Sequence, residues 1–307
     1  MIPPGAWQLL RGDSGYPECL ERTPRPPAVL YGVGDPGLLV PGLGVVGARK
    51  ATPYGLACAR RFAGWAAAAG VVIVSGAAIG CDLEAHTAAL DADGSSVAVL
   101  GCGADVDYPA CASKVLASLR RCGAVVSEMP WGSPPHRRAF VPRNRIIAGL
   151  SAAVLIVEAR LPSGTFTTAD LAADAGREVL AVPGSIHAPE SLGPNRLIRQ
   201  GATSITDISE LADELRALGI AVEPPGAPGR IPSGRDPLLR ALRADPMRVD
   251  DLARTFDLDI VTATRRIAAL EQAGEVVRYP DARYGVPVRE TQRRYNQSVG
   301  EENPRVP

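Results

Sequence analysis

One segment of the chain is rich in arginine and has no acidic residues, a combination suited to binding a polyanion. Residues 129–157 contain no Asp or Glu. They hold Arg137, Arg138, Arg143 and Arg145. Phe140 lies among these arginines, and because arginine neutralises phosphate while an aromatic ring stacks on any base, the pattern is typical of single-stranded nucleic-acid binding. The plain alternative is a solvated loop whose Phe140 packs into the core.

Short turns that contain glycine could contribute further contacts to an anion. Each turn lies between an apolar run and an expected helix, where backbone N–H groups and the helix dipole favour negative charge. The candidate ligand-contacting residues in these turns are Gly47, Ala48, Arg49, Lys50, Gly76, Gly80, Gly164 and Thr165. A P-loop pattern is absent from the sequence,. The turns therefore indicate an anionic ligand, and whether it is a nucleotide or a polymer stays open.

The elements that must position these residues follow a repeated order of strand, turn and helix. Apolar runs without alternation predict strands at residues 43–47, 71–76, 96–101, 124–128, 153–158 and 178–184,. Such runs are typical of parallel strands buried on both faces. We therefore expect a doubly wound, Rossmann-like α/β domain over residues 42–222, with the turns together at the carboxyl edge of the sheet. After a loop that holds Arg137, Arg138 and Phe140, a helix is expected over residues 143–150.

The remaining segments predict a second domain and its connections. Residues 1–41 are rich in Pro and Gly and predict an extended lead-in with one short strand at residues 28–31. Residues 223–236 predict a Pro/Gly linker. Three short helices and a hairpin over residues 237–288 predict a winged helix. The polar residues 289–307 predict a disordered tail.

Composition excludes several classes of protein. Apolar residues make up 46% of the 307 residues, which indicates a globular chain with a core,. The 33 basic and 33 acidic side chains balance, so any anion site must be local,. The six cysteines form no Cys-x-x-Cys pair, and neither a signal peptide nor a membrane span is recognisable,. These features predict a cytoplasmic protein that does not associate with a membrane and holds no metal or redox cofactor.

Several motifs, in order along the chain, resemble the DNA-processing protein A (DprA/Smf) family. The matching stretches include GVVGARKATPYG, VIVSGAAIGCDLEAHTAAL, FVPRNRIIAGLSAAVLIVEA and SGTFTTADLAADAGREVLAVPG. The resemblance extends over about residues 7–286. It implies a Rossmann-like domain that binds single-stranded DNA, forms a homodimer and helps to load the RecA recombinase during natural transformation or recombination.

The resemblance also assigns roles to individual residues. The phosphate-binding arginine of the family falls on Arg49, and its glycine turns fall on Gly47, Gly76 and Gly80. The basic and aromatic loop of the family covers Arg137, Arg138, Phe140, Arg143, Asn144 and Arg145.

This sequence departs from the family pattern at several places. Ala48 stands where several members carry a serine, and Ala110 stands where some carry a lysine. Many members begin with a helical domain, whereas this chain starts almost directly at the lead-in. Residues 235–294 hold 12 basic and 10 acidic side chains, so the winged helix is a weak candidate for reading DNA, and a partner-binding or structural role is equally open.

Two other classes of function compete with a non-catalytic, sequence-independent DNA binder. The fold and the Gly164-Thr165 turn are similar to the lysine-decarboxylase-like phosphoribohydrolases, which hydrolyse nucleoside monophosphates. Those enzymes carry a catalytic Glu where this chain has Thr168, so the general acid/base is missing,. A winged-helix transcription factor would need a basic recognition helix, and residues 260–273 offer only Arg265 and Arg266. The sequence therefore favours a single-stranded DNA-binding protein without enzymatic activity.

Overall fold

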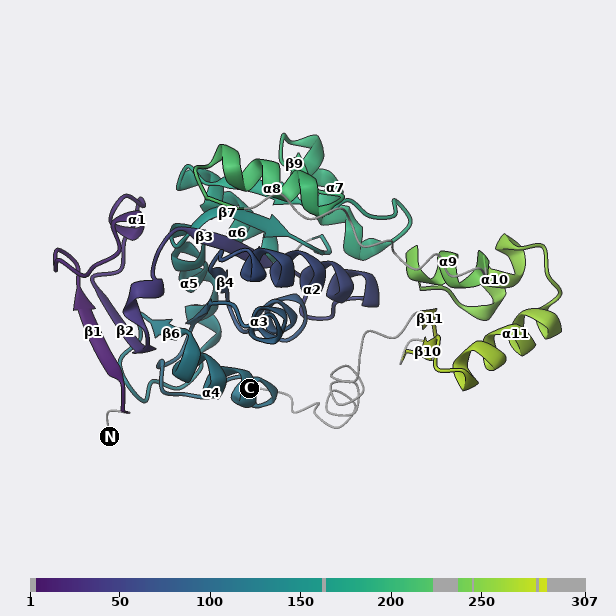
Figure 1. Cartoon of the computed structure of the whole chain (residues 1–307), viewed down its shortest axis with the longest axis horizontal. Helices are drawn as coiled ribbons and strands as arrows, with labels where there is room; N and C mark the ends of the chain where they lie inside the picture. Colours follow the sequence, from purple (N-terminus) through teal and green to yellow (C-terminus); the bar gives the residue numbers. More distant parts are fainter. Residues whose placement is uncertain (1–3, 162–163, 223–236, 245, 280–281, 286–307) are drawn as a thin grey trace. The chain divides into compact units, whose positions relative to one another are not determined.

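The computed structural model describes residues 4–161, 164–222, 237–244, 246–279 and 282–285. The chain divides into two compact units, one of residues 1–51 and 58–225 and one of residues 52–57 and 226–307. We describe the two units separately (Figure 1). Among the described residues, no helix has the length and apolar character that crossing a bilayer requires.

The first unit is built on a nine-stranded sheet in the order β1-β2-β6-β5-β4-β3-β7-β8-β9. The strands are β1 (Ala6–Leu10), β2 (Val29–Gly34), β3 (Gly42–Val46), β4 (Ile73–Ser75), β5 (Ser96–Leu100), β6 (Ala124–Ser127), β7 (Ser151–Ile156), β8 (Glu178–Ala181) and β9 (Thr203–Ser204). Strands β3 to β9 pair in parallel, while β1 and β2 pair antiparallel at one edge. The predicted fold class, a mostly parallel Rossmann-like sheet, is confirmed.

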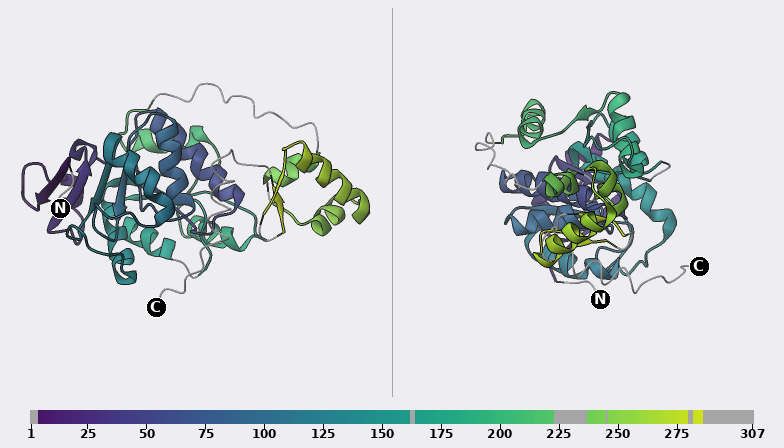
Figure 2. Two further views of the ribbon diagram at one scale, coloured as in Figure 1. Left: turned by 90° about the horizontal axis from the view of Figure 1, so that it is seen from below. Right: turned by 90° about the vertical axis from the view of Figure 1, so that its right-hand side faces the viewer.

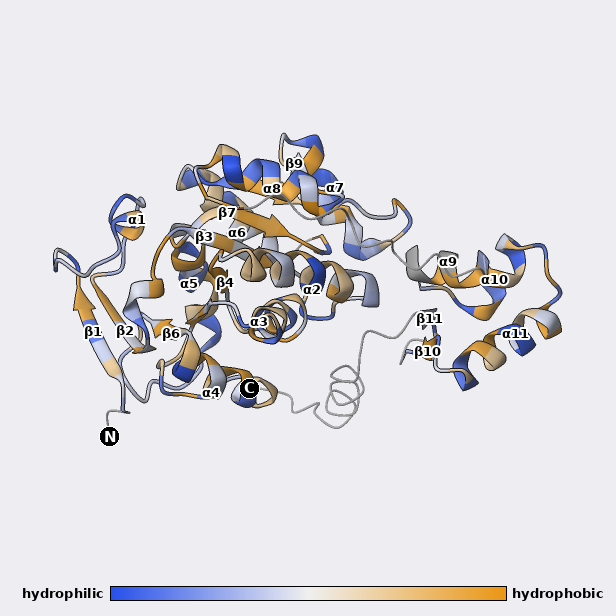
Figure 3. Cartoon of the chain, in the orientation of Figure 1, coloured by the Kyte–Doolittle hydropathy of each residue, from blue (hydrophilic) through white to orange (hydrophobic). Residues whose placement is uncertain are grey.

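Helices cover both faces of this sheet (Figure 2). They are α2 (Pro53–Ala68), α3 (Cys81–Asp91), α4 (Ser113–Cys122), α5 (Arg137–Gly149), α6 (Gly164–Asp174), α7 (Leu192–Arg199) and α8 (Ile208–Ala217). Neighbouring residues of β5 alternate between two cores: Val97 and Val99 pack with α5 and α6, whereas Ala98 and Leu100 pack with α4. The central strands are accordingly apolar on both sides (Figure 3),.

The lead-in contains more structure than the one strand expected at residues 28–31. It has two strands, β1 and β2, with the short helix α1 (Glu18–Glu21) between them and a 3-10 turn (Pro36–Leu38) after them. The ring of Trp7 lies where a side chain on Gly32 would be, since a Cβ there would come within 2.2 Å of it. The indole Nε1 of Trp7 donates to the carbonyl of Gly34 at 2.8 Å. Gly32 therefore makes room for the packing of β1 on β2, whereas Gly34 makes room for the carbonyl of Gly123, which a Cβ there would approach to 2.3 Å.

Helix α5 begins earlier than the sequence predicted, since the expected helix started at residue 143, just after Pro142. It starts at Arg137 and contains Pro142, although a proline removes one helical N–H and usually ends a helix,. His136 caps the start, because its Nδ1 accepts a hydrogen bond from the backbone N–H of Arg138 at 3.2 Å. The prediction of a loop carrying Arg137, Arg138 and Phe140 is therefore wrong: these residues form the first turns of a helix.

The second unit consists of three helices and a small hairpin. The helices are α9 (Pro237–Ala244), α10 (Val249–Thr255) and α11 (Ile260–Gln272), and the strands are β10 (Val277–Arg278) and β11 (Tyr284–Gly285). Leu238, Leu242, Leu252, Ile267 and Val276 form its core. This arrangement confirms the predicted winged helix. The linker and tail predicted at residues 223–236 and 289–307 lie outside the described residues, and the domain boundaries stay predictions.

Candidate functional site

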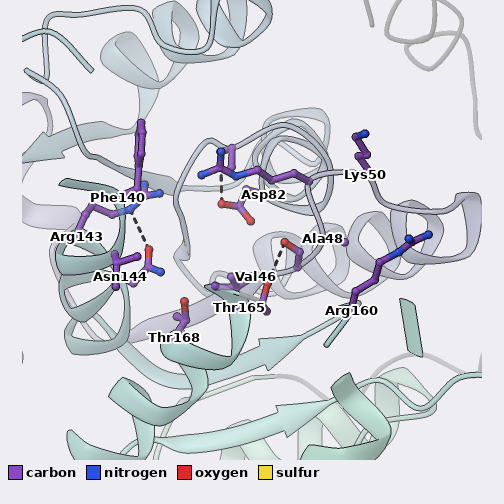
Figure 4. A pocket seen from close by; sticks show the side chains of 15 residues that line it. Val46, Ala48, Lys50, Asp82, Phe140, Arg143, Asn144, Arg160, Thr165 and Thr168 are labelled. Atoms are coloured by element: carbon purple, nitrogen blue, oxygen red, sulfur yellow. Dashed lines mark hydrogen bonds between the residues drawn. The ribbon is translucent and has the colours of Figure 1, made fainter. Parts of the chain in front are cut away.

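A pocket lies where the strand order of the sheet reverses. Strand β3 has β4 on one side and β7 on the other, so the chain winds outward from β3 and later returns beside it. In open parallel sheets, ligands bind at the carboxyl ends of the strands at such a reversal. The pocket has a volume of about 530 Å³ and is formed by the turn after β3, the first turns of α5 and α6, and the residue Arg160 after β7 (Figure 4).

The charges that line this pocket favour an anion. Arg49, Lys50, Arg143 and Arg160 are cationic, and Asp82 is the single carboxylate among the described lining residues. Helix α6 also begins here with Gly164 and Thr165, so the positive end of its dipole adds to the field,. The pocket is thus suited to phosphate.

Aromatic rings and Arg49 lie together on one side of the pocket. The rings of Tyr108 and Phe140 stack with centroids 5.6 Å apart, and the Arg49 guanidinium lies 5.4 Å from the Phe140 centroid. Phe140 is only half-buried and lines the pocket. The expected association of an arginine with an aromatic ring is present, although Phe140 also contacts Tyr108.

Arg143 is buried beside the pocket and connects the turn after β4 with β5. It is 4% exposed, and its Nη1 donates to the carbonyl of Gly76 at 2.7 Å and to that of Val99. Burial lowers the pKa of Arg143 to about 10, while nearby Asp82 opposes the shift. Nη1 is thus engaged at the carboxyl ends of β4 and β5, which indicates a structural role for Arg143.

Asp82 has the same kind of role in the neighbouring turn. Its Oδ2 accepts from the backbone N–H groups of Gly76 at 3.2 Å and of Ala78 at 3.4 Å. Burial raises its pKa, and Arg143 counteracts this by favouring the carboxylate. The Asp82 side chain therefore fixes the turn after β4.

The two glycines of this turn serve packing rather than direct contact with the pocket. A Cβ on Gly76 would come within 2.6 Å of the Arg143 guanidinium. Gly80 has φ +92°, and a Cβ there would come within 2.2 Å of the Ala48 carbonyl. Gly76 lines a smaller hollow of about 50 Å³ beside the pocket. Both glycines therefore shape the site indirectly, through Arg143 and the turn after β3.

Three polar side chains complete the floor. Asn144 accepts from Arg143 Nε at 3.2 Å, and Thr165 Oγ1 lies 3.5 Å from the carbonyl of Gly47. Thr168 is fully buried, and its Oγ1 has no hydrogen-bond partner among the described residues. Thr168 occupies the place of the glutamate that a phosphoribohydrolase would need, so this position supplies a hydroxyl and no general acid.

Nine of the predicted residues meet in the pocket. They are Gly47, Ala48, Arg49, Lys50, Phe140, Arg143, Asn144, Gly164 and Thr165. Arg137 and Arg138 are exposed outside it; Arg137 precedes Phe140 and Val141 by one helical turn and shares their face of α5,. Arg145 is turned away, because both of its Nη atoms donate to the carboxylate of Glu128, at 2.8 and 2.6 Å.

Arg160 is a pocket residue that was not among those predicted from the sequence. It lies in the segment after β7, four residues beyond Ile156, so the rule that ligands bind at the carboxyl ends of parallel strands could have identified it,. Thr168 was considered only as the replacement for a catalytic glutamate.

Comparison with known proteins decides the family. The family model described as DNA recombination-mediator protein A matches residues 7–216, and that of the DprA winged helix domain matches residues 222–282. The chain belongs to the DNA recombination-mediator protein A family. The resemblance drawn from the sequence motifs is therefore confirmed, and the chain is a member of a DNA-processing family.

Relatives of the DprA family support this membership along most of the chain. Protein Smf of Synechocystis is 32% identical over 90% of this chain and 79% of its own length. Protein Smf of Escherichia coli is 44% identical over 68% of this chain, which spans 56% of that protein. A solved structure of DprA from Streptococcus pneumoniae has a TM-score of 0.65 at 35% identity and covers 68% of this chain and 74% of its own.

A second solved structure concerns DNA processing protein A from Helicobacter pylori and its single-stranded DNA binding mode. It has a TM-score of 0.63 at 31% identity and covers 69% of this chain and 96% of its own.

Proposed function

We propose that this protein binds single-stranded DNA without sequence preference, through the pocket at the reversal of strand order. The observation that carries the proposal is the joint presence of Arg49, Phe140 and the start of α6 at one pocket. Arg49 and Lys50 neutralise phosphates, the N–H groups of α6 add donors, and Phe140 offers a stacking surface. The single-stranded DNA binding reported for the Helicobacter pylori relative supports the same ligand class.

The pocket offers less support for a nucleotide hydrolase. Among the described lining residues, Asp82 is the one carboxylate, and backbone N–H groups already occupy one of its oxygens. Thr168 cannot exchange a proton near neutral pH as a glutamate would. The proposed role is accordingly non-catalytic.

Fluorescence anisotropy with labelled oligo-dT, titrated at several salt concentrations, tests the binding proposal. We expect salt-sensitive binding that duplex DNA competes for poorly. Absence of binding, or a preference for duplex DNA, would contradict the proposal, and nucleoside monophosphates would then be the next ligands to test.

We further propose that the protein acts as a homodimer that loads the RecA recombinase onto the bound strand. Membership of the recombination-mediator family supports this role. Light scattering reports the mass of the particle, and RecA filament formation on strands pre-coated with a single-stranded DNA-binding protein reports loading. A monomer, or filament formation that this protein does not accelerate, would contradict the respective part of the proposal.

A further inference from the structure

Arg160 stands at the rim of the pocket, on the side opposite Phe140 and Asn144. Its side chain is 65% exposed, and Figure 4 shows it extending outward on the same side of the pocket as Lys50. It lies four residues after the end of β7, at the carboxyl edge of the sheet where ligands of such folds bind,. An exposed cation at this place lies across the pocket from α5, whose exposed Arg137 and Arg138 lie just outside the pocket.

Glu190 restrains the guanidinium of Arg160 through an ion pair. Its side chain is 3% exposed, and its Oε1 accepts from Nε of Arg160 at 3.2 Å and from Nη2. The backbone reinforces the pair, because the N–H of Ala159 donates to the carbonyl of Glu190 at 2.8 Å. Glu190 thus holds one edge of the Arg160 guanidinium, while most of the side chain stays in solvent.

The ion pair between Arg160 and Glu190 is not expected to stabilise the fold. Oε2 of Glu190 is buried and has no hydrogen-bond partner among the described residues, and a buried acceptor without a partner destabilises the fold,. An ion pair with one exposed member also contributes little. A guanidinium carries five N–H groups, and Glu190 accepts only from Nε and Nη2,. No described residue accepts from Nη1, which can therefore donate to another anion.

We propose that Arg160, paired with Glu190, is a phosphate-binding residue for the DNA strand. The proposal rests on the proposed function and extends it, because it places a phosphate contact on the rim opposite α5. A strand that contacts Arg49 at the centre then has cations on both sides, and it crosses the pocket from the start of α5 to the end of β7. Glu190 binds one edge of the guanidinium and the phosphate binds the other.

The test compares two variants that differ only at Arg160. Glu190→Gln is the background, because an amide oxygen still accepts from Arg160, and removing the arginine then leaves no buried charge without a partner. Binding of labelled oligo-dT to E190Q and to E190Q/R160A is measured by anisotropy at several salt concentrations. We expect a several-fold loss of affinity, and a decrease of about 0.7 in the slope of log K against log salt for the lost phosphate contact.

Arg199 provides the matched control. It is an exposed arginine in the last turn of α7 and does not line the pocket. The E190Q/R199A variant carries the same net charge as E190Q/R160A, and we expect the affinity and salt slope of E190Q itself. Thermal unfolding of all three variants checks that they are equally folded.

The outcomes separate this proposal from the one on which it rests. If the wild-type protein binds oligo-dT and the variants E190Q and E190Q/R160A bind with equal affinity and slope, Arg160 makes no phosphate contact and this proposal is overturned while the binding proposal stands. Equal losses in E190Q/R160A and E190Q/R199A would also overturn it, because the effect would then be one of net charge. If the wild-type protein does not bind, both proposals fail together.

Discussion

At the scale of single residues, Arg49 and Phe140 carry the proposed contact with DNA. We expect Arg49→Ala to lower the salt slope by about 0.7, and Phe140→Ala to weaken binding by about 1–3 kcal/mol while changing the slope little, since a ring neutralises no phosphate. Oligo-dT anisotropy measures both quantities, with Arg199→Ala as the control. Two folded variants that bind like the wild-type protein would show that this pocket is the wrong surface.

Arg137 and Arg143 were both expected to contact DNA, and the structure separates them. Arg143 is buried against the carbonyls of Gly76 and Val99, whereas Arg137 is exposed. We expect Arg143→Met to lower the free energy of unfolding by about 3 kcal/mol, because two buried carbonyls lose their donor and the buried Asp82 carboxylate loses a nearby positive charge,. Arg137→Ala should change it by less than about 0.5 kcal/mol and yet weaken oligo-dT binding. Urea unfolding and anisotropy of the same samples measure the two effects, and an Arg143→Met protein as stable as the wild type would refute the structural role.

The composition of the pocket could be predicted from the sequence, but the partner of each arginine could not. The carboxyl-edge rule brought together Arg49 and Gly164, the arginine-rich segment pointed to Phe140, and the family resemblance added Asn144; all four line the pocket although they lie on separate segments of the chain. Arg145 was counted as a DNA contact because the segment around it lacks acids, yet its partner Glu128 stands immediately before that segment. Which side chain an arginine meets depends on how α5 lies against β6, and local sequence does not contain that information.

At the scale of elements, the packing of α3 on the sheet depends on a neutral histidine. His86 is fully buried in α3, and its Nδ1 lies 2.7 Å from Ser96 Oγ at the start of β5. The Ser96 hydroxyl donates to the carbonyl of Ile73, so Nδ1 carries the proton, and Nε2 has no partner among the described residues,. Burial, with a smaller contribution from Arg143, lowers the pKa of His86 from 6.5 to about 3.

This histidine predicts a loss of stability in acid. Since the pKa of His86 is about 3 in the folded protein and the ordinary value for histidine is 6.5, the unfolded chain takes up the proton first as the pH falls,. The stability that neutral His86 contributes is complete above the unfolded pKa and is lost as the pH falls toward the folded one. Between pH 7 and pH 5.5, we expect the wild-type protein to lose roughly 1.3 kcal/mol more than His86→Leu. Urea unfolding at both pH values measures the difference, in which shared contributions from Asp82 and Glu84 cancel; equal losses would mean that His86 is not the group that titrates.

The elements that the sequence predicted and those it missed differ in burial. The central strands form runs such as residues 96–100 and 153–156, which are buried on both faces and so need no alternation to be recognised,. Strand β1 is half-exposed and antiparallel, and its partner β2 contains glycines that are typical of loops. Helix α5 begins at Arg137, six residues before the predicted start at residue 143. A proline usually interrupts a helix, but here the helix continues through Pro142 and His136 caps its start,. Tertiary pairing and side-chain capping thus decide the cases in which local propensity fails.

At the scale of the whole molecule, the two units carry different kinds of surface. Every residue that lines the pocket belongs to the α/β unit. In the winged helix, the start of α11 exposes Ile260 and Val261, and the preceding turn exposes Asp257 and Asp259. The start of a recognition helix is the part that contacts base edges in a helix-turn-helix protein, and acidic and apolar groups there disfavour phosphate.

We therefore expect the winged helix to contribute little to binding of a single strand. Arg265→Ala combined with Arg266→Ala in the full chain removes two cations from α11, and the affinity for oligo-dT should change by less than about two-fold, since neither residue lines the pocket,. Anisotropy under the conditions used for Arg49→Ala measures this. A loss as large as that of Arg49→Ala, with a lower salt slope, would contradict this expectation and mean that α11 makes phosphate contacts of its own.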